Sequence, residues 1–472
     1  MRSSFLLACL LAASVVHADT GASPATYRLD FFHTGGMGTE IFAVDRLRLE
    51  PLPWPGDPAR ADDGGQSGLY RYEVRDAEGN LLQARGYASV FGEWVTTDEA
   101  QKGHRTFHES LRFPAPAKAG VVQVRLFKRD ADQKFQPVWE TQLDTTDMFV
   151  DRSPVAGLPL LAIERHGPAR EKVDLLLLGD GYTVDECLNK FRKDAERMTA
   201  ALFRQQPFAR RRDDFNVWGL CPPATESGIS RPSTGIYRAS PAGATYDAFG
   251  SERYILSFDN RALREIASNA PYEALVILAN GATYGGGGIF GTYSTVAVDS
   301  VWADYLFVHE FGHHFAALAD EYYTSPVAYA PPQKIVEPWE PNVTALLDRD
   351  RLKWRGVMAK STPVPTPWPK AEFEAYQRDV QARRKQIRAA NRPETEMDAL
   401  FREEQAHETK MFAAERYRQV VGAFQGANYD AQAYYRPQLD CIMFTRNEVP
   451  FCHVCQDALE RVIDLYAGVP SP

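Results

Sequence analysis

One short segment of the chain contains residues that could bind a metal ion and activate water. His309 and His313 are four positions apart, so on a helix their imidazoles lie on the same face and can bind one zinc ion. Glu310 projects from the neighbouring side, where its carboxylate can reach a water molecule beside the metal and act as a general base. The pattern His309-Glu310-x-x-His313 therefore predicts a zinc site with its own base, the arrangement used by metallopeptidases.

The residues around this motif favour a functional role for it. Residues 305–308 and 315–318 are mostly apolar, which predicts a buried helix whose polar side chains need a partner. The alternative is that both histidines are core residues satisfied by hydrogen bonds, with Glu310 in an ion pair. His314 lies off the ligand face, and we expect it to pack against the core or to support the site from behind.

A catalytic zinc ion usually has three protein ligands and one position open to water. Asp320 is two helical turns beyond His313, so an unbroken helix would leave it too far from the metal, and we expect the chain to bend after about Leu318. Glu321 is the competing ligand. Asp320 is preferred because small residues precede it, a short carboxylate is easier to fix, and a single carboxylate leaves the zinc centre positively charged.

The sequence around the motif resembles a known family. His-Glu-Phe-Gly-His at 309–313, followed by Leu-Ala-Asp-Glu-Tyr at 318–322, is similar to the IgA peptidase family of zinc metallopeptidases. This metzincin-like group uses an Asp as third ligand in place of the more usual His, which implies zinc binding by His309, His313 and Asp320. Further stretches that match the family lie at residues 175–182, 215–218, 284–288, 435–437, 441–443 and 451–455. The resemblance begins near residue 165, and the block before it resembles the N-terminal domain of the same family.

The resemblance also implies roles for residues near the C-terminus. In metzincin-like folds a tight turn carrying a methionine forms an apolar floor under the zinc, and Met443 matches that position, although an ordinary core methionine is the alternative. Tyr434 and Tyr435 precede this turn. A phenol near the metal could donate to the oxyanion of the tetrahedral intermediate, and Tyr435 is preferred because it adjoins Arg436 and Pro437.

The first 18 residues are predicted to be a signal peptide. Arg2 is followed by an apolar run at 5–16, and Val16-His17-Ala18 is a small-x-small cleavage site. This run is too short to span a bilayer, and no later run approaches that length. We therefore expect a soluble protein that is exported, either secreted or periplasmic, after cleavage near Ala18.

Composition limits the classes of partner. The chain has 472 residues, a length that predicts two or three domains, and with 44% hydrophobic and 24% charged residues it has enough apolar material for two cores. A formal net charge of −9 argues against a nucleic-acid partner. Proteins or peptides are the expected partners, as substrates, and the sequence leaves the oligomeric state open.

Removal of the signal peptide would leave an odd number of cysteines, namely Cys187, Cys221, Cys441, Cys452 and Cys455. In an oxidising compartment an odd number leaves at least one free thiol or an intermolecular bond. Cys452-x-x-Cys455 could be a zinc knuckle or a redox pair. Because there is no second Cys-x-x-Cys and Cys441 is close by, a structural disulfide is favoured over both.

Residues 25 to about 150 are predicted to form an all-β sandwich. Apolar and polar residues alternate along 70–75 and 122–126, the period of half-buried strands. Residues 76–80 have the composition of a hairpin turn. The spacing of these strands fits a β-sandwich of about 120 residues.

The residue pattern changes after about position 165, and residues 165–472 are predicted to form an α/β (α+β) domain. Residues 173–178 form an apolar run typical of a strand buried on both faces, and a capping box at 183–186 begins a helix. The Gly-x-Gly turn between them could bind phosphate, but the third glycine of that fingerprint is absent. A strand at 275–279 leads into four glycines at 285–288, which could be a mobile loop or an edge strand that pairs with an extended substrate.

Residues 370 to about 424 are predicted to form a helical insertion. Their composition is rich in Glu, Arg, Gln and Ala, with apolar residues at helical spacing and a break near 391–393. We expect two helices that form a solvated hairpin within the second domain.

These observations predict a multi-domain protein with an N-terminal all-β sandwich and a metzincin-like zinc peptidase domain. The predicted activity is that of a secreted endopeptidase with one catalytic Zn²⁺, in which Glu310 is the general base. The alternative is a zinc-stabilised, catalytically inactive adhesion or glycan-binding protein whose β-domain carries the function. Glu310 separates the two hypotheses, because a purely structural zinc site has no use for a base beside the metal.

Overall fold

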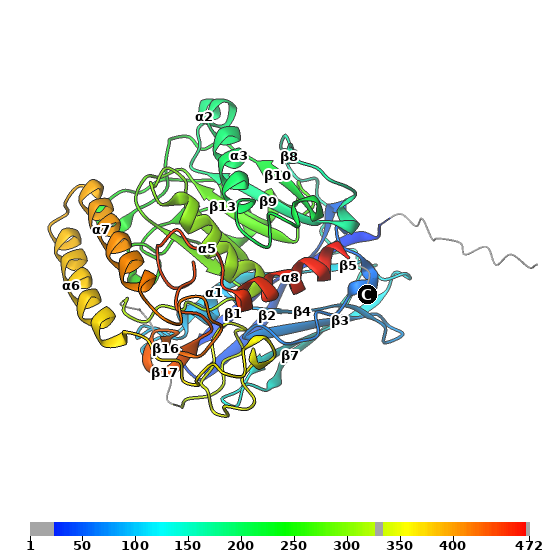
Figure 1. Ribbon diagram of the computed structural model, residues 1–472. Helices are drawn as coiled ribbons and strands as arrows, with labels where there is room; N and C mark the ends of the chain where they lie inside the picture. Colours follow the sequence, from blue (N-terminus) through cyan, green and yellow to red (C-terminus); the bar gives the residue numbers. More distant parts are fainter. Residues whose placement is uncertain (1–22, 326–333, 469–472) are drawn as a thin grey trace, which may run out of the picture.

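The computed structural model describes residues 23–325 and 334–468, so the predicted signal peptide lies outside the described residues. The chain forms an N-terminal domain rich in antiparallel strands, followed by a mixed α/β domain (Figure 1). None of the helices in these two ranges combines the length and the apolar character needed to cross a membrane.

Two antiparallel sheets form the N-terminal domain, one with the strand order β2-β1-β5 and the other with the order β4-β3-β6-β7. The strands are β1 (Ala25–Gly36), β2 (Thr39–Pro53), β3 (Tyr70–Arg75), β4 (Leu81–Tyr87), β5 (Arg105–Pro114), β6 (Val121–Arg129) and β7 (Phe135–Asp144). Phe31 and Phe113 from the first sheet and Val124 from the second belong to one hydrophobic core. The prediction of a strand-rich first block is therefore confirmed.

The sequence patterns along β3 and β6 and at the turn after β3 predicted these elements correctly. The apolar side chains that alternate along β3 and β6 are buried, as their period predicts. The Asp76 N–H donates to the Asn80 carbonyl over 3.0 Å, and Gly79 has a φ of 86°, so these residues form the expected turn between β3 and β4. One short helix, α1 (Val90–Trp94), follows β4.

A mixed sheet with the strand order β14-β15-β13-β9-β10-β8 organises the second domain. Its inner strands are parallel to one another, and β8 and β14 pair antiparallel at the two edges. The strands are β8 (Leu161–Glu164), β9 (Val173–Asp180), β10 (Phe215–Leu220), β13 (Ala274–Ala279), β14 (Gly286–Ile289) and β15 (Tyr293–Ala297). Every residue of β9 is buried, as expected for a central strand covered on both faces.

Helices pack on the sheet and extend its core. They are α2 (Val184–Asn189), α3 (Phe191–Leu202), α4 (Asn260–Ala267), α5 (Ala303–Ala316) and α8 (His453–Ala467). The capping box that predicts the start of α2 is present, since Thr183 and Glu186 each accept a hydrogen bond from the backbone N–H of the other. The expected single helix is divided at Lys190 into α2 and α3.

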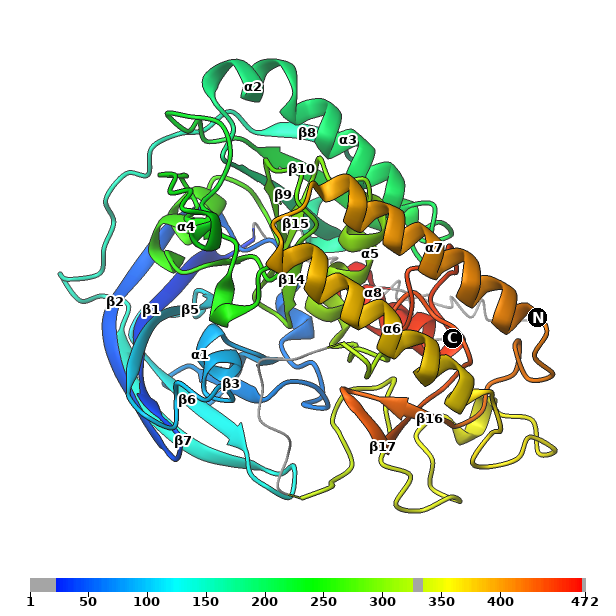
Figure 2. The same cartoon turned by 90° about the vertical axis from the view of Figure 1, so that its left-hand side faces the viewer.

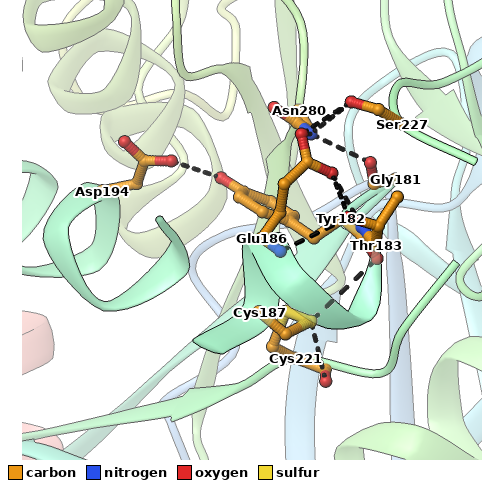
Figure 3. Close-up of a disulfide and its surroundings, with 9 residues drawn as sticks. All are labelled: Gly181, Tyr182, Thr183, Glu186, Cys187, Asp194, Cys221, Ser227 and Asn280. Atoms are coloured by element: carbon orange, nitrogen blue, oxygen red, sulfur yellow. Dashed lines mark hydrogen bonds between the residues drawn. A yellow bond between two sulfur atoms is a disulfide. The ribbon is translucent and has the colours of Figure 1, made fainter. Parts of the chain in front are cut away.

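A disulfide connects α2 to the end of β10 by joining Cys187 to Cys221 (Figure 3). Beside it, the Asn280 side chain donates to the Gly181 carbonyl and to the Glu186 carboxylate, at 3.0 and 3.1 Å. The Gly-x-Gly turn is thus part of a packed corner, and a Cβ at Gly181 would lie 2.5 Å from the carbonyl oxygen of Gly228. This close packing accounts for the glycine at position 181, so the Gly-x-Gly turn does not require a bound phosphate as its explanation.

The helical insertion consists of α6 (Lys370–Ala389) and α7 (Glu394–Ala413), which lie side by side (Figure 2). The break falls near 391–393 as predicted, with Asn391 at a φ of 46°. The hairpin is solvated on its outer face only, because Phe373, Val380 and Phe401 on its inner face are buried in the main core of the second domain. The hairpin of β16 (Phe424–Ala427) and β17 (Asp430–Arg436) follows, and two-stranded pairing also joins β11 (Ala244–Thr245) to β12 (Leu256–Ser257).

Candidate active site

Helix α5 carries the His-Glu-x-x-His motif and lies directly against the edge strand β14. A Cβ atom at Gly288 would lie 2.4 Å from the Glu310 carbonyl oxygen, and one at Gly286 would lie 3.0 Å from the Glu310 Cγ. On the other side of the helix, a Cβ at Gly312 would lie 3.1 Å from the Met443 Sδ. Glycines at these positions therefore let the strand and the methionine-bearing turn approach the motif closely.

Three ligand atoms converge beside this helix. The Nε2 atoms of His309 and His313 are 3.2 Å apart, and Oδ1 of Asp320 lies 3.1 and 3.2 Å from them. A tetrahedral zinc ion with bonds of about 2.0–2.1 Å separates its ligand atoms by roughly 3.3 Å. The three side chains thus have the spacing that one zinc ion requires, and a carboxylate oxygen of Glu310 lies within 4.8 Å of ligand atoms of both histidines.

Asp320 reaches the histidines because the chain leaves the helix early. Helix α5 ends at Ala316, and Ala317 adopts left-handed backbone angles with a φ of 57°, so the expected bend is present slightly before Leu318. The buried Asn342 side chain then fixes the extended segment by accepting from the Ala319 N–H and donating to the Ala319 carbonyl, at 2.8 and 2.9 Å. Sequence spacing gave no signal for Asn342.

Hydrogen bonds orient all three candidate ligands. The Nδ1 of His309 donates to the Ile442 carbonyl over 3.0 Å, and the Nδ1 of His313 donates to the Leu318 carbonyl. These bonds leave both Nε2 lone pairs directed at the shared point. The Tyr429 hydroxyl donates to Oδ2 of Asp320, which holds the carboxylate in place. Tyr429 was missed by sequence reasoning, and its only signal is its place in a stretch with several tyrosines.

Burial and mutual charge shift the proton affinities in the site. Burial raises the pKa of Glu310 above its ordinary value, with the neighbouring histidines opposing the shift. For Asp320 burial acts in the same sense, but the adjacent imidazoles outweigh it and hold the pKa well below its usual range. Burial lowers the pKa of His313, yet Asp320 raises it more, to about 9. A divalent cation at the ligand atoms would displace a proton bound there, so metal binding and proton release are coupled.

The candidate ligands line a cleft of about 720 Å³ built by separate parts of the chain. Glu93 from the N-terminal domain, Gln377 from α6 and Tyr434 from β17 contribute to its walls. The volume lies within the range of about 300–1,000 Å³ typical of ligand pockets. A larger cavity of about 1410 Å³ next to α8 includes none of the three candidate ligands, so size alone does not identify the site.

The structure does not bring Tyr435 to this group. Its backbone N–H donates to the Thr344 carbonyl over 2.9 Å, and its hydroxyl lies 3.5 Å from the Gln425 amide nitrogen. Because successive side chains of a strand point to opposite faces, Tyr434 lines the cleft and Tyr435 does not. The prediction of Tyr435 as an oxyanion donor is therefore not supported.

His314, which directly follows the motif, has the supporting role that the sequence predicts. It supports the site from behind, since the Leu275 N–H of β13 donates to its Nε2 and its Nδ1 donates to the Ile289 carbonyl of β14.

The expected disulfide among the last three cysteines is wrong. Cys441 is free and buried, as are Cys452 and Cys455. They lie together with the buried Glu321, which points away from the histidines.

Comparison with protein families identifies the chain. Residues 161–463 match the family described as IgA Peptidase M64, and residues 19–140 match the Peptidase M64 N-terminus. A search of curated proteins gives no match. The two family matches cover most of the sequence, in the order that the resemblance implied. The chain therefore belongs to the IgA peptidase M64 family, a family of metallopeptidases.

Proposed function

We propose that this protein is an exported, zinc-dependent endopeptidase that hydrolyses peptide bonds with Glu310 as general base. The observation that carries the proposal is the convergence of His309 Nε2, His313 Nε2 and Asp320 Oδ1 within 3.1–3.2 Å of one another, beside Glu310 and in an accessible cleft. Zinc bound by these residues would supply a Lewis acid that polarises the scissile carbonyl and acidifies water.

Glu310 moves the protons of the reaction. Its carboxylate accepts a proton from the attacking water and delivers it to the leaving amine. The raised pKa that burial gives this group favours the first step, because the protonated form is less costly than for an exposed glutamate. Tyr429 acts through Asp320, whose carboxylate it orients.

The edge strand β14 is suited to hold an extended substrate. It is the last strand of the sheet, and Gly286, Gly287 and Gly288 line the cleft next to the motif. Its outer edge is occupied at Gly286, which accepts from the Ile255 N–H and donates to the Arg253 carbonyl, so a substrate could add only beyond Gly286. A peptide that adds to such an edge gains backbone hydrogen bonds whatever its side chains are. This position supports the edge-strand interpretation of the glycine run over that of a mobile loop.

The alternative of a catalytically inactive, zinc-stabilised binding protein is less well supported. A structural zinc site is closed by protein ligands, whereas these ligands line an open cleft and have a carboxylate beside them. The N-terminal domain also lines this cleft through Glu93 and Thr96, so its position fits a role in the same site.

The test is the Glu310→Ala variant of the mature protein, measured with an unfolded protein substrate. We expect zinc at the histidine site to be retained and the cleavage rate to fall by about 10²–10⁴-fold, the usual contribution of a general base. Glu372→Ala, which removes an exposed carboxylate of α6, is the matched control and should cleave normally. Cleavage by Glu310→Ala at the wild-type rate would overturn the mechanism.

A further inference from the structure

Behind the cleft, four side chains that can ligate a metal lie together in the protein interior, namely Glu321, Cys441, Cys452 and Cys455. None of the four is more than 4% exposed, and their ligand atoms all lie within 4.8 Å of one another. We call this group the thiol cluster. It is separate from the histidine site, although Glu321 directly follows Asp320 in the sequence.

Distances in the thiol cluster fit a tetrahedral zinc ion. The Sγ atoms of Cys441 and Cys455 are 3.9 Å apart, and Oε1 of Glu321 lies 3.3 Å from Cys455 Sγ and 3.8 Å from Cys452 Sγ. Zinc bonds of about 2.3 Å to sulfur and about 2.1 Å to oxygen place two sulfurs roughly 3.8 Å apart and an oxygen roughly 3.6 Å from a sulfur. A disulfide would instead bring two of these sulfurs to about 2.05 Å.

Backbone hydrogen-bond donors are directed at two of the three sulfurs. Backbone N–H groups of Met443 and Cys452 point at the Sγ of Cys441, at 3.5 and 3.2 Å, and that of Cys455 points at the Sγ of Cys452, at 3.4 Å. Hydrogen-bond donors directed at sulfur stabilise its negative charge. The fully buried Arg436 adds a positive charge that acts on Glu321 and Cys441.

Glu321 supplies an independent indication that a ligand belongs here. Its side chain is fully buried, and Oε1 accepts a hydrogen bond from the Asn342 amide over 3.0 Å. Its other oxygen, Oε2, has no hydrogen-bond partner among the residues described. A buried carboxylate with an unpartnered oxygen is costly, and a metal ion bound at Oε1 would offset the charge of this carboxylate.

We propose that Glu321, Cys441, Cys452 and Cys455 bind a second, structural zinc ion. Three thiolates select zinc over magnesium and calcium, and four protein ligands leave no position for water or substrate. The site has no general base of its own and lies outside the cleft wall, since none of its four ligands lines the cleft.

The second ion would join the parts of the chain that position the first. Cys452 caps the start of α8, and the turn at 441–443 accepts hydrogen bonds at the Ile442 carbonyl from His309 and at the Met443 carbonyl from the Glu321 N–H. Zinc in the thiol cluster would therefore fix the turn that orients His309 and the segment that carries Asp320.

Zinc content of variants that lack the histidine site tests the proposal. We expect one zinc ion per chain in the His309→Ala/His313→Ala variant, measured by elemental mass spectrometry after dialysis, and none when Cys455→Ser is added. Cys187→Ser/Cys221→Ser in the same background is the matched control, because it removes sulfurs distant from the cluster, and it should retain the ion. Absence of zinc from the folded histidine variant would overturn the second site.

A measurement on the wild-type protein covers the case in which a variant does not fold. Replacement of zinc by cobalt(II) should give the near-ultraviolet charge-transfer absorption of cobalt–thiolate bonds, which a site of histidines and carboxylate lacks. Mass mapping of alkylated protein should show all three cluster thiols free. No charge-transfer band, or a disulfide among these three cysteines, would overturn the second site and leave the proposed catalytic role of Glu310 untouched.

Discussion

Asp320 and Glu321 are adjacent in the sequence but belong to two different sites. Asp320 faces His309 and His313 and lines the cleft. Glu321 faces the opposite way, into the sealed thiol cluster, where the Met443 carbonyl accepts its backbone N–H. The two sites therefore share a backbone segment while differing in access to solvent.

Access to solvent and the neighbouring side chains decide what each metal site can do. The histidine site combines three candidate ligands with an open cleft and a carboxylate base, which are the requirements of hydrolysis. The thiol cluster offers four candidate ligands in a closed interior, which suits a structural ion. The thiol cluster has the larger number of candidate ligands, but only the histidine site has the solvent access and the base that catalysis needs.

The largest expected effect separates the two adjacent carboxylates. Asp320→Ala should weaken zinc binding at the histidine site by far more than about 10–100-fold, the usual cost of losing a group that only supports a ligand, and cleavage should fall with it. Glu321→Ala should leave zinc at the histidine site. Bound zinc and cleavage rate are measured in both variants, and retention of the histidine-site ion in the first with its loss in the second would make Glu321 the ligand.

A smaller effect is expected from the hydroxyl that holds Asp320. Tyr429→Phe removes the donor to Oδ2, and zinc affinity should fall by about 10–100-fold. Tyr435→Phe removes a hydroxyl outside the cleft and is the matched control. Titration with a competing chelator measures both affinities. Equal affinities in the two variants, or a loss only in Tyr435→Phe, would contradict the assignment.

The smallest expected effect concerns the contact between β14 and α5. Gly288→Ala places a methyl group 2.4 Å from the Glu310 carbonyl oxygen, so the free energy of unfolding should fall by about 1–3 kcal/mol as strand and helix separate. Gly356→Ala is the control, because nothing lies within 4 Å of its added atom. Urea denaturation gives both values, and equal stabilities would show that the strand does not need this close approach.

Sequence patterns predicted features that depend on local geometry. The spacing of His309 and His313 fixes their shared face once the segment is helical, and the capping box at Thr183 fixes the start of α2. Alternation predicted β3 and β6 because one face of each strand is buried. Such signals need only a few neighbouring residues.

Features that depend on distant contacts were not predicted. Tyr429 lies 109 residues from Asp320, and no spacing rule connects them. Tyr435 was predicted as an oxyanion donor from its place beside Arg436 and Pro437, which does not report its distance from the metal ligands. The disulfide joins Cys187 to Cys221, while the closer cysteines at 441, 452 and 455 stay free. The burial of the inner face of α6 and α7 was missed because their apolar residues are sparse among charged ones.

The two proposed metal sites are tested most directly by the anomalous scattering of wild-type crystals at the zinc absorption edge. We expect one peak between His309 Nε2, His313 Nε2 and Asp320 Oδ1, with Glu310 beside it, and a second peak within the thiol cluster. A map without a peak between the two histidines, or with Glu321 bound there in place of Asp320, would contradict this assignment.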